Sequence, residues 1–385
     1  MDVEFSEEQQ EIRRALRDAL DKQSDSPAVR AAMVTEHGFD PKVWRRLCEQ
    51  TGLAGLGIPE EYGGVGLTFA EVVIALEEMG RTLFPSPFLA SSVMAASAVV
   101  HSGDEAACGE LLPGIAEGTT LATLALAEPG SRDVTEVSLT ATATPSGEHR
   151  LDGVKTHVLD GAAADLVLVA ARLDGQVALF AVAGDAAGLT RTQLPVLDQT
   201  RHQARLDFDN TPARLLGTPG ADTAAVLERV RQLTEIAVAA ESVGGAGRCL
   251  DMTVEYSKIR VQFGRAIGSF QALKHRCADM YVQLETSRSA LYYAAWAATE
   301  AEAAGLDVDP DAPGAGELPV MAPLAMTTAT AAYRQIAEET IQLHGGVGFT
   351  WEHDAHLYLK RATTSALLFG DRTHQRERIA ALAGI

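Results

Sequence analysis

Hydrophobic and polar positions divide the chain into two helical stretches around a β-patterned middle. Over the first 120 residues, apolar side chains recur at three- and four-residue intervals, as in Ile12, Leu16 and Leu20, which indicates amphipathic helices. Ser6 followed by Gln9 matches a capping box at the start of such a helix. The segments TFAEVVIALEEMGR and SSVMAASAVVHSG show the same spacing. Residues 1–120 are therefore predicted to form a helical domain.

The spacing of apolar and polar residues changes near residue 121. VSLTATATP alternates with a period of two, and LVLVAA and VALFAVA are short apolar runs separated by Gly, Pro and Asp. Such runs are typical of strands joined by turns. We predict a compact antiparallel β domain over residues 121–218.

From residue 223 onward the pattern is helical again. Three long periodic segments follow one another, at residues 224–260, 270–305 and 322–346, and the third ends in glycines. Residues 219–385 are predicted to form a C-terminal four-helix bundle. The fold class is then α+β, with three domains.

Composition limits the function. The 385 residues carry a net charge of −20, which argues against nucleic acid as a partner because phosphate-binding surfaces are basic. We expect no signal peptide and no membrane span, since neither a basic and apolar leader nor an uncharged apolar run of about 18 residues is present. The four cysteines have no CxxC spacing, so we expect free thiols in the cytoplasm and no zinc.

Two motifs suggest a nucleotide-binding role. In YSKIRVQFGRAIGSFQ, Arg260 suits a phosphate and Phe263 suits an aromatic base, although a surface arginine and a core phenylalanine would give the same letters. In IQLHGGVGFTWEHDAH, Gly345 and Gly346 allow a close approach to the backbone, or they simply end a helix. Glu352, His353 and His356 lack a further ligand for a metal, and none is predicted.

Together with GIPEEYGGVGLT and LLPGIAEGTTLATLALAEPG, these motifs resemble the acyl-CoA dehydrogenase family of flavoproteins over essentially the whole chain. The resemblance implies an FAD lying between subunits. Its adenosine diphosphate half is expected to contact two groups of residues, which are Arg260, Phe263, Gly264 and Gln271, and Gln342, Gly345, Gly346 and Gly348.

The flavin-ring and thioester half departs from the family pattern. In LAEPGSRD, the residues Glu128 and Ser131 are expected to bind substrate, but Ala127 replaces the usual threonine. The family's Trp-Ile-Thr-Asn segment is HVLDG here, so His157 replaces an indole and Leu159 replaces a hydroxyl that would bond the flavin.

The catalytic base of the family is also displaced. The usual glutamate position holds Phe369, and the alternative position on the preceding helix holds Thr234, which we expect on the substrate side. Glu241 lies two helical turns beyond Thr234 on the same face. We therefore take Glu241 as the hypothetical α-proton base, with Glu235 and Asp371 as weaker candidates. The alternative is a structural carboxylate paired with Arg248 or Arg276.

The resemblance implies FAD-dependent α,β-dehydrogenation of an acyl-CoA to a trans-2-enoyl-CoA, with electrons passed to an electron-transfer flavoprotein. The displaced base suggests a bulky or branched acyl group, including a steroid-derived one. The chain is then a homotetrameric enzyme. Alternatively, it completes a partner's FAD site in an α2β2 heterotetramer with a paralogue, in which case Glu241 should form a salt bridge. A flavin oxidase or monooxygenase on the same fold is a third possibility.

Overall fold

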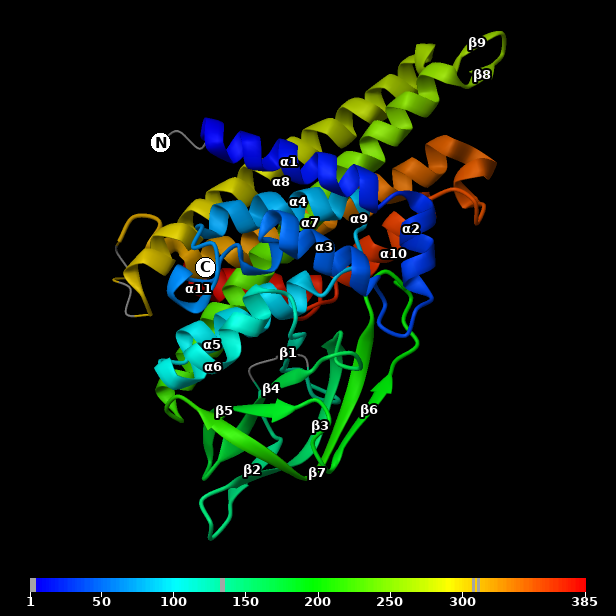
Figure 1. The fold of residues 1–385 in the computed structure, drawn as a ribbon. Coiled ribbons are helices and arrows are strands. Elements are labelled where there is room, and N and C mark those ends of the chain that lie inside the picture. The colour runs from blue at the N-terminus through cyan, green and yellow to red at the C-terminus, as the bar shows by residue number, and fades with distance from the viewer. Residues whose placement is uncertain (1–4, 132–135, 307–308, 310–311) are drawn as a thin grey trace.

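The computed structural model describes residues 5–131, 136–306, 309 and 312–385 (Figure 1). A set of helices leads into a seven-stranded sheet, and a second set of longer helices completes the chain. This order confirms the predicted α+β fold class, with helical regions on both sides of a β region in the sequence.

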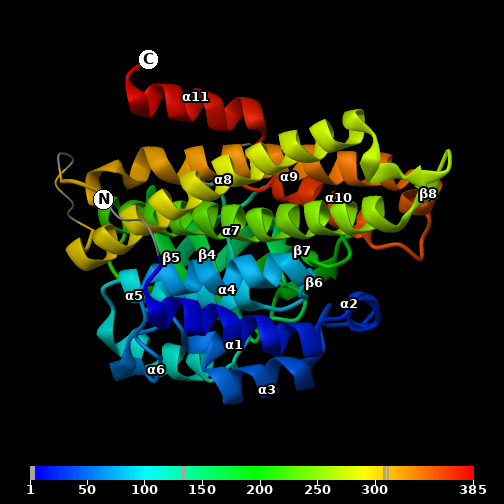
Figure 2. The same cartoon turned by 90° about the horizontal axis from the view of Figure 1, so that it is seen from above.

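The N-terminal helices are layered against the C-terminal ones, with α4 next to α7 and α1 and α3 farther out (Figure 2). The predicted capping box is confirmed, because the Ser6 hydroxyl accepts from the Gln9 N–H and the Gln9 side chain accepts from the Ser6 N–H. The elements are α1 (Glu7–Gln23), α2 (Ser26–Met33), α3 (Pro41–Thr51), η1 (Leu53–Gly55), η2 (Glu60–Tyr62), α4 (Phe69–Thr82), the π-helical turn η3 (Leu89–Ala95), α5 (Ala96–His101) and α6 (Glu105–Ala116).

The sheet lies below the helices in Figure 1 and has its own apolar core. It comprises β1 (Ala122–Ala125), β2 (Thr140–Ala143), β3 (His149–Leu159), β4 (Leu166–Leu173), β5 (Gln176–Ala183), β6 (Leu189–Gln193) and β7 (Gln203–Leu216). β1 and β2 both pair with β4 in parallel, and the remaining pairings are antiparallel. The predicted antiparallel domain is thus corrected to a mixed sheet, because an alternating pattern reports which face is buried and not the direction of the neighbouring strand.

The C-terminal region is built on three long helices that pack along one another. The elements are α7 (Ala221–Ile259), β8 (Val261–Gln262), β9 (Arg265–Ala266), η4 (Ile267–Ser269), α8 (Gln271–Ala304), η5 (Ala315–Glu317), α9 (Leu318–His344), η6 (Gly345–Phe349), α10 (Ala355–Ser365) and α11 (Arg372–Ala383). The β8–β9 hairpin joins α7 to α8 and projects beyond the rest of the bundle (Figure 1). Among the described residues, no helix is long and apolar enough to cross a membrane.

Glycines allow α4 and α7 to cross at backbone distance. A Cβ on Gly80 of α4 would overlap the Glu241 carbonyl of α7, and a Cβ on Gly244 of α7 would overlap the Glu77 carbonyl of α4. On another side of α7, Gly245 faces the ring of Tyr333 in α9. The small-residue run of α7 is therefore occupied by neighbouring helices.

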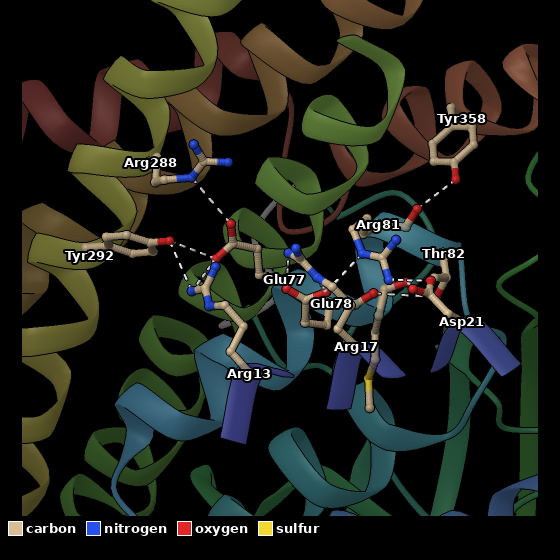
Figure 3. A network of polar contacts seen from close by, with 11 residues as sticks. Arg13, Arg17, Asp21, Glu77, Glu78, Arg81, Thr82, Arg288, Tyr292 and Tyr358 are labelled. Carbon is tan, nitrogen blue, oxygen red and sulfur yellow. Dashed lines mark hydrogen bonds and ion pairs between the residues drawn. The ribbon is translucent and has the colours of Figure 1, made fainter. Parts of the chain in front are cut away.

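Buried carboxylates of α4 tie this layer to its neighbours (Figure 3). Glu77 accepts from Arg13 of α1 at 2.9 Å and from the Tyr292 hydroxyl of α8 at 2.9 Å, and Arg288 lies 3.4 Å from its other oxygen. Glu78 accepts from Arg17 of α1 at 2.7 and 2.9 Å. Because unpaired buried carboxylates are costly, these pairs determine where α1 and α8 lie against α4.

The α4–α7 crossing makes a testable prediction. Gly244→Ala should lower the free energy of unfolding by about 1–3 kcal/mol or more, since the helices have to separate to admit the methyl group. The measurement is the denaturant midpoint. Gly109→Ala is the matched control, because Gly109 is an exposed glycine of α6 whose added Cβ would meet nothing within 4 Å. The control should be neutral or stabilising, and equal effects of the two changes would contradict the close crossing.

Candidate active site

The residues expected at the adenosine half of FAD gather at one end of the bundle. Arg260 follows the last turn of α7 and is exposed. Phe263 and Gly264 form the tip of the β8–β9 hairpin with φ of +52° and +76°, as tight two-residue hairpin turns require. The Phe263 side chain is 91% exposed. The alternative of a core phenylalanine is therefore wrong for this chain.

The second group of these residues lies close by. Gln342 is exposed in the last turn of α9, and Gly345 ends that helix with a φ of +61°. A Cβ on Gly345 or Gly346 would meet nothing within 4 Å. The rings of Tyr256 in α7 and His344 in α9 stack at 4.5 Å between centroids, so the two helix ends are held together. Gln271 is exposed in the first turn of α8.

This end of the bundle thus presents an arginine, two amides, an exposed aromatic ring and open glycine backbone. A planar guanidinium and side-chain amides suit a pyrophosphate, and the ring suits an aromatic base. Neighbouring apolar side chains are exposed too, at Ile259, Val261, Val347, Phe349 and Trp351. An exposed apolar patch with a polar rim is typical of a surface that contacts another subunit.

On the β domain, Glu128 has an inward-facing carboxylate. It accepts from the buried Lys155 ammonium at 2.7 Å, from the Ser138 hydroxyl and from the Ser138 and Leu139 N–H groups at 3.0 Å. Burial opposes ionisation, but the donors from Lys155 and Ser138 outweigh it and lower the pKa of Glu128 to about 2. Glu128 therefore holds the ends of this loop together, and its contact with a substrate stays a prediction.

The rest of the ring-side segment is partly described. The Ser131 hydroxyl lies 3.0 Å from Glu136, while residues 132–135 of the same loop lie outside the described residues. In the HVLDG segment, Leu159 is buried and its carbonyl accepts from the Thr123 hydroxyl at 2.6 Å. His157 bonds Gln203 at 2.8 Å. Nothing in these contacts restores the indole or the hydroxyl of the family pattern.

Glu241 lies inside the molecule, between α7 and the β domain, and is 7% exposed. One carboxylate oxygen accepts from Arg201, in the loop between β6 and β7, and the other lies 3.6 Å from Arg361 of α10. The lone pairs of this carboxylate are therefore directed at the N–H donors of two guanidinium groups. The partners Arg248 and Arg276 suggested by the sequence are wrong, since Arg276 pairs with Glu339.

Arg361 connects this pair to a larger network. Its Nε donates to Asp198 at 2.7 Å, and its Nη2 donates to the carbonyl and hydroxyl of Thr200 at 2.9 and 2.6 Å. All of these residues are buried. The network therefore joins α7 and α10 to the loop of residues 198–201 in the β domain. The sequence analysis did not identify Arg201, Arg361 or Asp198. A carboxylate in an apolar run indicates that a cationic partner is present, but it does not show which residue that partner is.

The other carboxylates considered for the base are engaged as well. Glu235 is fully buried and its Oε1 accepts from Arg231 and from Arg378 of α11, each at 2.7 Å. Asp371 caps α11 by accepting from the N–H groups of Thr373 and His374.

The expected placement of Thr234 on the substrate side stays a prediction. Its side chain is fully buried, and its hydroxyl donates to the Val230 carbonyl of the same helix at 2.6 Å. Phe369 has a positive φ of 60°, and its carbonyl accepts from the Gln375 side chain at 2.7 Å. The described residues include no group of three or more His, Cys, Asp or Glu able to hold a metal ion.

Comparisons with known proteins extend over almost the whole chain. Residues 6–119 match the family Acyl-CoA dehydrogenase, N-terminal domain, and residues 226–383 match Acyl-CoA dehydrogenase, C-terminal domain. The acyl-CoA dehydrogenase IpdE2 of Mycobacterium tuberculosis is 39% identical over 94% of this chain and 93% of its own length.

Two solved structures have the same fold. A variant of the Tcur3481–Tcur3483 steroid ACAD is 30% identical with a TM-score of 0.86, and 98% of each chain is covered. The ChsE4–ChsE5 complex of Mycobacterium tuberculosis is 29% identical with a TM-score of 0.87, over 100% of this chain and 99% of that one. The family matches, the extent of the identity and the shared fold agree, and this chain belongs to the acyl-CoA dehydrogenase family.

Proposed function

We propose that this chain is one of two different subunits of an α2β2 acyl-CoA dehydrogenase. In this assembly it completes the FAD site of a paralogous partner, and the partner supplies the catalytic base. The observation that carries the proposal is the burial of Glu241 between Arg201 and Arg361. A salt bridge at this residue is what the partner-subunit hypothesis requires.

The chemistry of the base supports this assignment. Removing the α-proton of a thioester needs a carboxylate in a dry pocket, with a free lone pair aimed at the proton. Glu241 and Glu235 are each contacted by two arginines, and the family position at residue 369 is a phenylalanine. Glu241 therefore does not offer a free lone pair. Glu235 keeps one unbonded oxygen, Oε2, but its side chain is fully buried and its other oxygen accepts from both arginines.

The two halves of the expected FAD site differ in how well they fit the cofactor. Arg260, Gln342 and the open backbone at Gly345 fit the pyrophosphate, and the exposed Phe263 fits the adenine. On the ring side, Leu159 lacks the hydroxyl, and the buried network of Arg201 and Glu241 lies between the β domain and α7. The first half therefore suits a flavin held largely by another subunit.

In such an assembly, bound FAD supplies the acceptor for the hydride that leaves the β-carbon. This chain's Arg260 and Gln342 hold the phosphates, and its hairpin orients the adenosine. The product is a trans-2-enoyl-CoA, and an electron-transfer flavoprotein takes up the electrons. Two of the similar structures are a steroid ACAD and a complex of two differently named chains, which supports a steroid-derived acyl-CoA and a paralogous partner.

The first prediction concerns flavin content. Purified alone, the chain should carry little FAD, whereas co-expression with a paralogous subunit should give a yellow complex with about one FAD per two chains. Absorbance of the flavin against total protein measures this ratio. A yellow homotetramer with about one FAD per chain would instead support the autonomous enzyme, and oxygen consumption without an added acceptor would point to an oxidase.

The second prediction concerns Glu241. In the mixed complex, Glu241→Gln should lower the melting temperature, because Arg201 and Arg361 lose their shared anion. The rate of flavin reduction by substrate should remain within about threefold of the parent, since general bases typically contribute 10²–10⁴-fold. Stopped-flow bleaching of the flavin measures this rate. A loss of about 100-fold or more in a folded complex would make Glu241 the base after all.

The third prediction concerns the adenosine half. Arg260→Leu should weaken FAD binding by the mixed complex about 10- to 100-fold, because charge-assisted hydrogen bonds contribute roughly 1.5–3 kcal/mol. Lys258→Leu is the matched control, since Lys258 is an exposed cation at the same end of α7. Titration of the deflavinated complex with FAD measures both. Equal affinities for the two variants would contradict the assignment of Arg260.

A further inference from the structure

A cavity of about 280 Å³ lies among the N-terminal helices and the end of α8. Its walls come from the turn that leads into α4 and the first turn of α4, from η3 and α5, and from the last turns of α8. None of the residues expected to contact FAD, and none of the carboxylates considered for the base, is among the described residues that line it. The cavity is therefore separate from the candidate active site.

The floor of this cavity is apolar. The buried side chains that line it are Ile58, Phe69, Val72, Val93 and Ala96. Thr68 and Ala303 line it too and are exposed, so the cavity opens to the surface there. Apolar cavities of roughly half this volume bind molecules of the size of benzene.

One wall of the cavity carries a carboxylate and an imidazole. His101 Nε2 lies 3.2 Å from one oxygen of Glu302, and Arg229 Nη1 donates to the other oxygen at 2.9 Å. Burial opposes ionisation of Glu302, but the hydrogen bonds and charges of His101 and Arg229 outweigh it and lower the pKa of Glu302. Glu302 and His101 line the cavity, so its polar end is an ionised carboxylate beside a histidine ring.

Ser92 adds a hydroxyl to the lining. It belongs to the π-helical turn η3, and its oxygen is buried without a hydrogen-bond partner among the described residues. Serine inside a helix often bonds a backbone carbonyl, as Ser242 bonds the Val238 carbonyl at 2.7 Å. A buried polar group without a partner is an exception that requires an explanation, and π-helical turns are frequent at functional sites. A ligand that bonds Ser92 from within the cavity would remove the exception.

The size and charge of the cavity define the ligand class. At about 30 Å³ for each group of the size of a water molecule, a cavity of about 280 Å³ holds up to about nine such groups. A steroid ring system is larger than this. The described residues that line the cavity include no lysine or arginine, and the Glu302 carboxylate repels an anion. Because Glu302 is already paired with Arg229, a cation would lose hydration without gaining a free counter-charge.

We propose that this cavity binds a small neutral alcohol. The hydrocarbon part of the ligand lies against Ile58, Phe69 and Val93, which are buried and apolar. The ligand hydroxyl lies beside Glu302 and His101 and donates to a carboxylate oxygen, which an acceptor-only group such as a ketone cannot do. The proposal goes beyond the proposed function, because it applies whichever subunit holds the flavin.

Calorimetric titration of the full chain, alone and in complex with its partner subunit, tests the ligand class with 1-hexanol, hexanoate and hexylammonium near neutral pH. 1-Hexanol should bind with a dissociation constant of about 1 mM or below, as expected for roughly seven non-hydrogen atoms. Its affinity should exceed that of either ion by about tenfold or more, because a charged head loses hydration in the cavity. Absence of 1-hexanol binding, or equal or tighter binding of either ion, would overturn the proposal.

Two substitutions at the edge of the cavity test the location. Val100→Trp and Ala303→Trp place an indole at half-buried and exposed lining positions, and each should weaken 1-hexanol binding by about tenfold or more because the ring fills the space of the ligand. Val34→Trp is the matched control, since Val34 is 80% exposed and lies after α2, and it should bind like the parent. Parent-like binding by both cavity variants would show that the alcohol binds elsewhere. That outcome would leave the flavin stoichiometry, which tests the proposed function, unaffected.

Discussion

Pairing of buried carboxylates with arginines from distant elements is the constraint on which this helical core depends. Glu77, Glu78, Glu235 and Glu241 are all buried on α4 or α7. Each of them pairs with at least one arginine of another element, which is α1 or α8 for the α4 carboxylates, α11 for Glu235, and α10 and the β-domain loop for Glu241. Arg81 of α4 and Arg231 of α7 add pairs within the same helix. Stripping water from a carboxylate costs several kcal/mol. The surrounding elements are therefore positioned by charge as well as by the burial of apolar area.

The long helices could be predicted from the sequence, because helical periodicity and capping are local properties. The segment predicted from residue 224 is found as α7, Ala221–Ile259, and the Ser6–Gln9 capping box is present. The partners of Glu241 could not be predicted in the same way. Arg201 lies 40 residues before it, and Arg361 belongs to another helix. The sequence suggested Arg248 or Arg276, and Arg276 pairs with Glu339 instead.

The same difference between local and long-range contacts explains why one half of the expected FAD site could be predicted from the sequence in more detail than the other. The expected adenosine half consists of short segments whose conformation is local, such as the hairpin tip with positive φ at Phe263 and Gly264. Its hairpin and helix end could therefore be predicted from the sequence, while the binding of FAD there stays a prediction. The ring half depends on where α7, α10 and the β domain meet, and on charges that only the fold brings together. Sequence identified the anomaly at Glu241 but not its surroundings.

This separation also makes a division of labour between two subunits physically reasonable. The β8–β9 hairpin projects from one end of the bundle (Figure 1). Its contact with a neighbouring subunit would therefore not depend on the contacts between the bundle and the chain's own β domain. At that junction, an autonomous dehydrogenase needs a dry pocket with an unpaired base. Here the space holds a charge-balanced network that joins the domains. Interactions that stabilise the junction therefore use the carboxylate that catalysis would require to be free.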